Sequence, residues 1–92
     1  SLEGGEYAVD DVAIYPNPVN SQLRIKATSL EDKAVRVRIY SLLGNVVFDQ
    51  NVSQWSAEGL IIDAQQFPAG TYIVRMESEG IAPVTKEIVV LR

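Results

Sequence analysis

A two-residue hydrophobic period is the strongest constraint on how this chain can fold. It is clearest where Val35, Val37 and Ile39 alternate with Arg36 and Arg38. Successive side chains of an extended strand point to opposite faces, whereas an α-helix needs a period near 3.6 residues. No helical period competes with this pattern, so the sequence predicts strands that each turn one face to a core.

Seven segments carry the pattern, and clusters of turn-forming residues separate them. They cover residues 12–14, 23–27, 35–39, 46–48, 60–62, 71–77 and 84–91. The third and fourth are joined by residues 41–45, a short loop in which Gly44 is free to adopt a positive φ, so this pair is predicted to be a hairpin. Seven short strands without a helix predict an all-β fold, a single immunoglobulin-like antiparallel β-sandwich of about seven strands.

Length and composition exclude several classes of function. A chain of 92 residues forms one domain with a small core. It contains no cysteine and no histidine, which removes thiolate ligands, the commonest transition-metal ligand and the commonest general base. The net charge of −4 disfavours a nucleic-acid partner. We therefore predict no catalytic residues, no metal, no cofactor and no nucleic-acid partner.

The acidic residues and the apolar runs do not predict further sites. Asp10, Asp11 and Asp63 lack the loop spacing with which calcium sites gather six to eight oxygens, so they predict no metal site. The apolar runs at residues 59–62 and 88–91 are far shorter than the roughly 20 residues that cross a bilayer, so we expect no membrane span.

The first ten residues differ from the rest of the chain. They hold three acidic residues and the pair Gly4-Gly5, a composition that suits a flexible linker. We expect residues 1–10 to be this linker and to contain a processing site, and residues 11–92 to form the domain. The opening lacks an initiator methionine and a signal-like apolar stretch, so we expect a fragment of a longer protein.

Two prolines in the stretch AIYPNPVNSQLRI form a stiff corner. Pro16 lacks a backbone donor and should end the first strand, and Pro18 restricts Asn17 to an extended conformation. Most such corners only stop a strand or protect a sheet edge. The corner therefore becomes informative only together with other motifs.

Several motifs follow one another in a distinctive order. The corner at residues 14–18 is followed by the hairpin motif at 37–44, by the turn and strand at 67–72, and by a last strand that begins at Lys86. This arrangement resembles the C-terminal sorting domain of the type IX secretion system (the Por secretion system) of Bacteroidetes, type A. The resemblance covers about residues 11–92.

The resemblance implies a recognition signal and not an enzyme. Such domains direct an upstream cargo in the same chain across the periplasm and the outer membrane to the cell surface or the medium. Their implied partners are the type IX translocon and a sortase-like protease, which removes the domain and attaches the cargo to anionic lipopolysaccharide. The residues that match the family's sorting motif are Tyr15, Pro16, Asn17, Pro18, Gly44, Gly70, Tyr72 and Lys86.

The last strand has two apolar faces. Ile88 and Val90 point one way, and Val89 and Leu91 the other. One interpretation is that these four residues dock to the translocon, because exposed apolar rows are often interaction sites. The other is that the strand is a core strand buried on both faces.

The remaining features leave alternatives open. Arg24, Lys26, Arg36 and Arg38 would form a basic stripe for an anionic partner if their strands were neighbours, and otherwise a solvated face. Trp55 is interpreted as a core plug, with a sugar-stacking platform as the alternative. The alternative function is a carbohydrate-binding or adhesive immunoglobulin-like module that uses Trp55, Tyr7, Tyr15 and Tyr40. An exposed edge strand would also allow two copies to pair as a homodimer.

Overall fold

The computed structural model describes residues 7–92. In this range the chain forms seven β-strands and two short 3₁₀ turns, joined by loops. All seven predicted strands are confirmed, and within this range no α-helix is present and none of the elements could span a membrane as a helix. The strands are β1 (Ala13–Tyr15), β2 (Gln22–Lys26), β3 (Val35–Ser41), β4 (Val46–Val52), β5 (Leu60–Asp63), β6 (Gly70–Glu77) and β7 (Val84–Val90). The 3₁₀ turns are η2 (Thr28–Leu30) and η3 (Ala64–Gln66).

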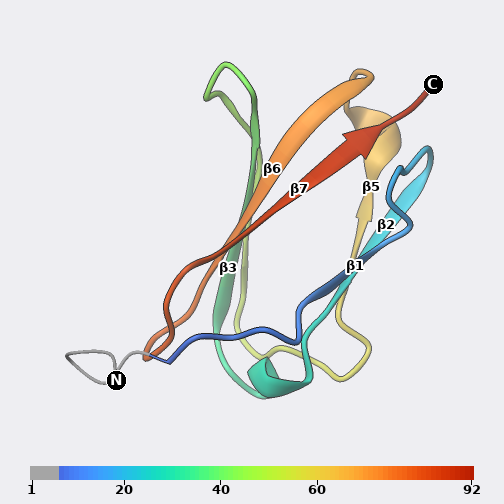
Figure 1. The fold of residues 1–92 in the computed structure, drawn as a ribbon. Coiled ribbons are helices and arrows are strands. Elements are labelled where there is room, and N and C mark those ends of the chain that lie inside the picture. Colours follow the sequence, from blue (N-terminus) through green and yellow to red (C-terminus); the bar gives the residue numbers. More distant parts are fainter. Residues whose placement is uncertain (1–6) are drawn as a thin grey trace.

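The strands form two antiparallel sheets that pack face to face (Figure 1). One has three strands in the order β1-β2-β5, and the other has four in the order β4-β3-β6-β7. The β3–β4 and β6–β7 pairs are hairpins, whereas β3–β6 and β2–β5 join strands that are distant in the sequence. This arrangement confirms the predicted antiparallel β-sandwich.

The core lies between the sheets and is built by the inward half of each alternation. In β3 the side chains of Val37 and Ile39 are fully buried, and the β3–β6 register places them opposite Met76 and Val74. The three-stranded sheet contributes buried side chains of the same kind, Leu23 among them. Each such side chain stabilises the fold by roughly 1.5 to 3 kcal/mol relative to full exposure. The two-residue period thus determines which side chains fill the core between the two sheets.

Trp55 is a core residue, as the plug interpretation predicts. Only 1% of its surface is exposed. Its backbone N–H donates to the Lys33 carbonyl and its carbonyl accepts from the Asp32 N–H, both at 2.8 Å. The indole Nε1 has no hydrogen-bond partner among residues 7–92. A buried indole cannot stack on a sugar, so the platform alternative is wrong.

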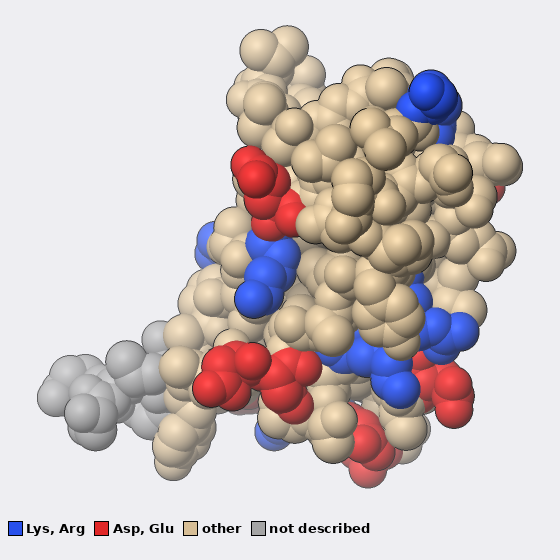
Figure 2. Space-filling model, turned by 45° about the vertical axis from the view of Figure 1, so that its right-hand side comes forward, with Lys and Arg blue, Asp and Glu red and all other residues tan. Residues whose placement is uncertain are grey.

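The basic stripe does not form, because β2 and β3 belong to different sheets. Three of its members are also paired with acids: Arg36 with Asp49 at 2.8 Å, Arg38 with Glu77, and Arg24 with Glu58 at 3.7 Å. On the face seen in Figure 2, Lys and Arg occur in separate groups interspersed with Asp and Glu. Alternation predicts which side of a strand faces out, but not which strands become neighbours.

Two glycines are required by the backbone. Gly44 turns the β3–β4 hairpin with φ +92°, as predicted, and its N–H donates to the Ser41 carbonyl at 2.9 Å. Gly59, which the sequence did not single out, has φ +80° and lies so close to β2 that a Cβ would sit 2.0 Å from the Ile25 carbonyl oxygen. Only glycine therefore allows the chain at position 59 to approach β2 just before β5 begins.

Candidate recognition surface

The proline corner lies between β1 and β2, and all four of its residues are exposed. β1 ends at Tyr15, directly before Pro16, as the missing proline donor predicts. The Tyr15–Pro16 and Asn17–Pro18 peptide bonds are both cis. The corner thus faces solvent at one end of the three-stranded sheet.

The side chain of Asn17 binds the backbone of the last strand. Its Oδ1 accepts a hydrogen bond from the Val89 N–H at 3.0 Å, and its Nδ2 donates to the Glu87 carbonyl at 3.2 Å. The amide therefore satisfies one donor and one acceptor on the edge of β7 that β6 leaves unpaired. Sequence reasoning missed this contact, because the residues it joins lie about 70 positions apart.

Val19 continues the same pairing by its backbone. Its N–H donates to the Val89 carbonyl at 2.9 Å, and its carbonyl accepts from the Leu91 N–H at 2.8 Å. These bonds form a parallel bridge between Val19 and Val90. The corner and the end of β7 therefore form one continuous surface, which we call the corner–β7 surface and define as residues 15–19 and 87–91.

The two faces of β7 differ in exposure. Ile88 and Val90 are buried in the core, at 0% and 1% exposure. Val89 is half-buried and Leu91 is 51% exposed. Of the four residues predicted to dock, the folded domain therefore offers only Val89 and Leu91 to a partner. The strand is not fully buried on both faces.

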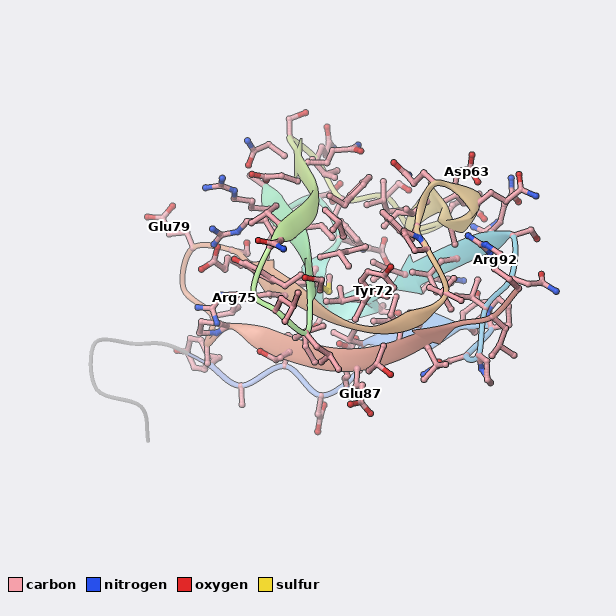
Figure 3. The ribbon with its side chains drawn as sticks, turned by 90° about the horizontal axis from the view of Figure 1, so that it is seen from above. Asp63, Tyr72, Arg75, Glu79, Glu87 and Arg92 are labelled. Atoms are coloured by element: carbon pink, nitrogen blue, oxygen red, sulfur yellow. The ribbon has the colours of Figure 1, made fainter. Side chains whose placement is uncertain are left out.

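Gly70 and Tyr72 lie on β6, directly beside the end of β7. The register pairs Gly70 with Val90 and Tyr72 with Ile88, and Gly70 has φ +153°. The Tyr72 ring lies 5.6 Å from the ring of Phe67, and its hydroxyl donates to the Pro68 carbonyl at 2.5 Å. Figure 3 shows Tyr72 pointing between the sheets, whereas Glu87 points outward. Tyr72 is thus an internal anchor for β7.

The other two motif residues lie apart from the corner. Lys86 is exposed, although its position on β7 is in register with buried Val74. Gly44 belongs to the β3–β4 hairpin, which β6 separates from β7 in the sheet order. The structure thus places six of the eight motif residues beside the end of β7 and Lys86 on β7 itself, and it leaves Gly44 outside this group.

Arg92, which follows β7, is hydrogen-bonded to backbone carbonyls near β2 and β5 of the other sheet. Its guanidinium donates to the Asn20 carbonyl at 2.9 Å, to the Ala64 carbonyl at 2.7 Å and to the Phe67 carbonyl. In Figure 3 it lies near Asp63, at the end of β5. A single arginine after a strand carries no sequence signal for such a role, so the sequence did not identify it.

Charged groups gather on the outer face of the four-stranded sheet. Arg36 binds both carboxylate oxygens of Asp49, at 3.0 and 2.8 Å, and holds the pKa of Asp49 below its usual range. Hydrogen bonds from Arg38 and Arg75 likewise lower the pKa of Glu77. Among residues 7–92 no group of three or more acidic side chains is placed to hold a metal ion.

The aromatic residues of the alternative function do not share a surface. Tyr15 is on the outer face of the three-stranded sheet, whereas Tyr40 is on β3 of the other sheet, beneath the Arg38 guanidinium. Tyr7 pairs with Ile81 in the loop between β6 and β7, and Trp55 is buried. Stacking on a sugar needs exposed rings in one place, so no observation favours the carbohydrate-binding module.

Fold and comparisons agree on the class of protein. The chain is similar to a solved structure of a DUF3244-family protein from Bacteroides vulgatus, described as an immunoglobulin-like β-sandwich. The TM-score is 0.71, the identity is 19%, and the match covers 86% of this chain and 83% of the other. At this identity the likeness shows the fold, which is an immunoglobulin-like β-sandwich. No match was found among curated proteins.

A family model then gives the identity. The model described as the secretion system C-terminal sorting domain matches residues 13–91, nearly the whole sandwich. The chain therefore belongs to this family, the sorting signals of the type IX secretion system. Membership implies attachment to a cargo protein, interaction with the secretion machinery, and export through the outer membrane to the cell surface or the medium.

Proposed function

We propose that residues 11–92 act as the address of an exported cargo, without chemistry of their own, and that the corner–β7 surface is what the type IX translocon contacts. The family match over residues 13–91 carries the function itself. The choice of surface rests on the way Asn17 and Val19 unite the proline corner with β7.

Several accessible side chains of this surface are apolar, beside exposed Asn17 and Glu87. Tyr15 is 45% exposed and Leu91 is 51% exposed, and the prolines beside them face solvent. Exposed apolar groups of this kind commonly supply the centre of a protein interface. The translocon would then contact Tyr15, Val89 and Leu91, while Ile88 and Val90 keep β7 in the core.

We further propose that a sortase-like protease cuts within residues 1–10 and transfers the cargo to anionic lipopolysaccharide. Residues 1–6 of this segment lie outside the described part of the structure. From residue 7 onward the segment is attached to the sandwich: the Tyr7 N–H donates to the Gly80 carbonyl at 3.0 Å, and the Ala82 N–H donates to the Tyr7 carbonyl at 2.9 Å. Because these hydrogen bonds hold Tyr7 to the loop between β6 and β7, we place the cut on the N-terminal side of Tyr7.

A reporter fusion tests the addressing function. Residues 1–92 are placed behind a periplasmic reporter in a type IX-competent bacterium, and surface delivery of the reporter is measured. Deleting residues 88–92 would be a poor variant, because it removes two buried core side chains. The sharper variant is Leu91→Ser, with Leu43→Ser as the matched control, because Leu43 is 90% exposed at the tip of the β3–β4 hairpin.

The expected result is that Leu91→Ser lowers surface delivery about fivefold or more, as for a central contact of an interface, while Leu43→Ser does not. Both variants should unfold at the urea concentration of the parent domain. Equal delivery of the two variants would refute the proposed surface. Retention of a folded parent fusion in the periplasm would refute the addressing function itself.

A further inference from the structure

Edge strands differ in how well this sandwich protects them. Exposed sheet edges attract further strands, and proteins protect them by shortness, proline, covering chains or inward-pointing charges. β1 has three residues and ends before Pro16, and β5 has four residues. β7 is covered by Asn17 and Val19, and Lys86 occupies an inward position next to the uncovered part of its edge.

β4 has none of these protections. It has seven residues, and it contains neither proline nor a basic side chain. Within residues 7–92, its backbone makes no hydrogen bond to any element other than β3. From Phe48 to Val52, where its pairing with β3 is regular, about half of its backbone donors and acceptors therefore point to solvent.

The side chains of β4 are complementary to a second copy of the same strand. Phe48 and Val52 are half-buried on the inward face with exposed Gln50 between them, and Asp49 and Asn51 point outward. In an antiparallel pair centred on Gln50, Phe48 lies opposite Val52 of the second copy, and Asp49 lies opposite Asn51 of the second copy. Apolar groups thus meet apolar groups, and a carboxylate meets an amide donor.

Other registers are less favourable. A pair centred on Asp49 would set two carboxylates opposite each other and Phe48 opposite Gln50, and like charges opposite one another destabilise a sheet. The irregularity in the β3–β4 pairing between Ile39 and Tyr40 also limits regular pairing to the second half of the strand. Asp49 is already held by Arg36 at 2.8 Å, so its charge is compensated in a Gln50-centred pair.

We propose that β4 is a self-association edge, through which two copies of this domain pair antiparallel with Gln50 on the two-fold axis. The pairing joins the two four-stranded sheets into one continuous sheet. One pair of short strands buries less surface than the roughly 1,200 Å² of a standard interface, so the dimer is a weak one.

Disulfide trapping tests both the edge and the register, because the chain has no cysteine of its own. In Gln50→Cys the two thiols face each other, with Cα atoms about 4.5 to 5.5 Å apart as in directly opposed strand residues, which suits a disulfide. Under mild oxidation we expect this variant to form covalent dimers at least about tenfold faster than Asn51→Cys, whose thiols would be diagonal neighbours about 7 to 8 Å apart or farther. Glu87→Cys on β7 and Ile61→Cys on β5 control for random collision, since both side chains are exposed.

A second measurement does not depend on oxidation. Sedimentation velocity of the unmodified domain should show a monomer–dimer equilibrium at concentrations up to about 1 mM, the range of weak interfaces. Gln50→Lys introduces on β4 the inward-pointing charge that β7 has at Lys86, and it should keep the domain monomeric with an unchanged far-UV spectrum. A parent domain that stays monomeric, a folded Gln50→Lys variant that still dimerises, or equal trapping at Gln50 and at the controls would each overturn the proposal.

Discussion

At the scale of single residues, Asn17 explains why asparagine stands between the two prolines. Its amide has one acceptor and one donor that match the Val89 N–H and the Glu87 carbonyl on the edge of β7. Aspartate has no donor, and leucine has neither group. The corner therefore does more than end β1, because the Asn17 side chain covers the edge of a strand that lies at the other end of the sequence.

Asn17→Asp should lower the free energy of unfolding by about 1 to 2 kcal/mol. The carboxylate can still accept from the Val89 N–H, but it places an oxygen against the Glu87 carbonyl where the amide donor was. Urea unfolding measures the loss, and amide hydrogen exchange at Val89 should become faster. Asn45→Asp is the control, because Asn45 is exposed in the β3–β4 turn and its side chain makes no hydrogen bond within residues 7–92. Equal losses in the two variants would contradict the role given to Asn17.

For the strands and sheets, the sequence predicted where each strand lies in the chain better than it predicted which strands pair with one another. Alternation located all seven strands and the inward rows of β3 and β6, because a strand's faces are set by its own side chains. The sheet to which a strand belongs depends on contacts between distant segments. For this reason alternation alone left the basic stripe and the solvated face as alternatives, and it did not predict the bond between Asn17 and β7.

The candidate surface shows the same division. The motif residues were found from their order along the chain, but only the structure shows that Tyr72 is an internal anchor, that Ile88 and Val90 are core residues, and that Arg92 is bound. Gly59 was missed because its requirement comes from the Ile25 carbonyl, a neighbour on β2 that local sequence does not reveal. Local patterns therefore predicted the elements, and long-range contacts decided their roles.

The charged groups on the outer face of the four-stranded sheet predict a pH dependence of stability. Hydrogen bonds from Arg38 and Arg75 lower the pKa of Glu77 below its ordinary value of 4.5. A carboxyl group whose pKa is lower in the folded state stabilises the fold fully above its ordinary pKa, and this contribution is lost as the pH falls through the folded value. Stability should therefore decrease on acidification below about pH 4.5.

Glu77→Gln should make this decrease smaller, because the glutamine cannot take up a proton. The free energy of unfolding in urea is measured at about pH 6 and about pH 3, on either side of the titration. Glu58→Gln is the matched control, since the Glu58 side chain is 86% exposed and its oxygen is 3.7 Å from Arg24, too far for a hydrogen bond. If the free energy of unfolding falls between these two pH values by as much in Glu77→Gln as in the parent, the assignment to Glu77 is contradicted.

At the scale of the whole molecule, Arg92 links the two layers at the end of the last strand. The residue follows β7 of the four-stranded sheet, and its guanidinium donates to the carbonyls of Asn20, shortly before β2, and of Ala64, at the start of η3. Asn17 and Val19 hold the same end of β7 from the side. The end of the last strand is thus fixed from two directions, which keeps the corner–β7 surface in one arrangement.

Arg92→Lys should lower the free energy of unfolding by about 1 to 2 kcal/mol, because an ammonium group keeps the charge but lacks the planar fork that reaches three carbonyls. Arg24→Lys is the matched control: Arg24 donates to one carbonyl, that of exposed Glu58, and its loss should stay within about 0.5 kcal/mol. Urea unfolding measures both, and the slope with denaturant should stay unchanged because the surface exposed on unfolding is the same. Exchange of the Leu91 amide, whose N–H donates to the Val19 carbonyl at 2.8 Å, should accelerate in Arg92→Lys alone. Similar losses in the two variants, or unchanged exchange at Leu91, would mean that the end of β7 holds its place without the arginine.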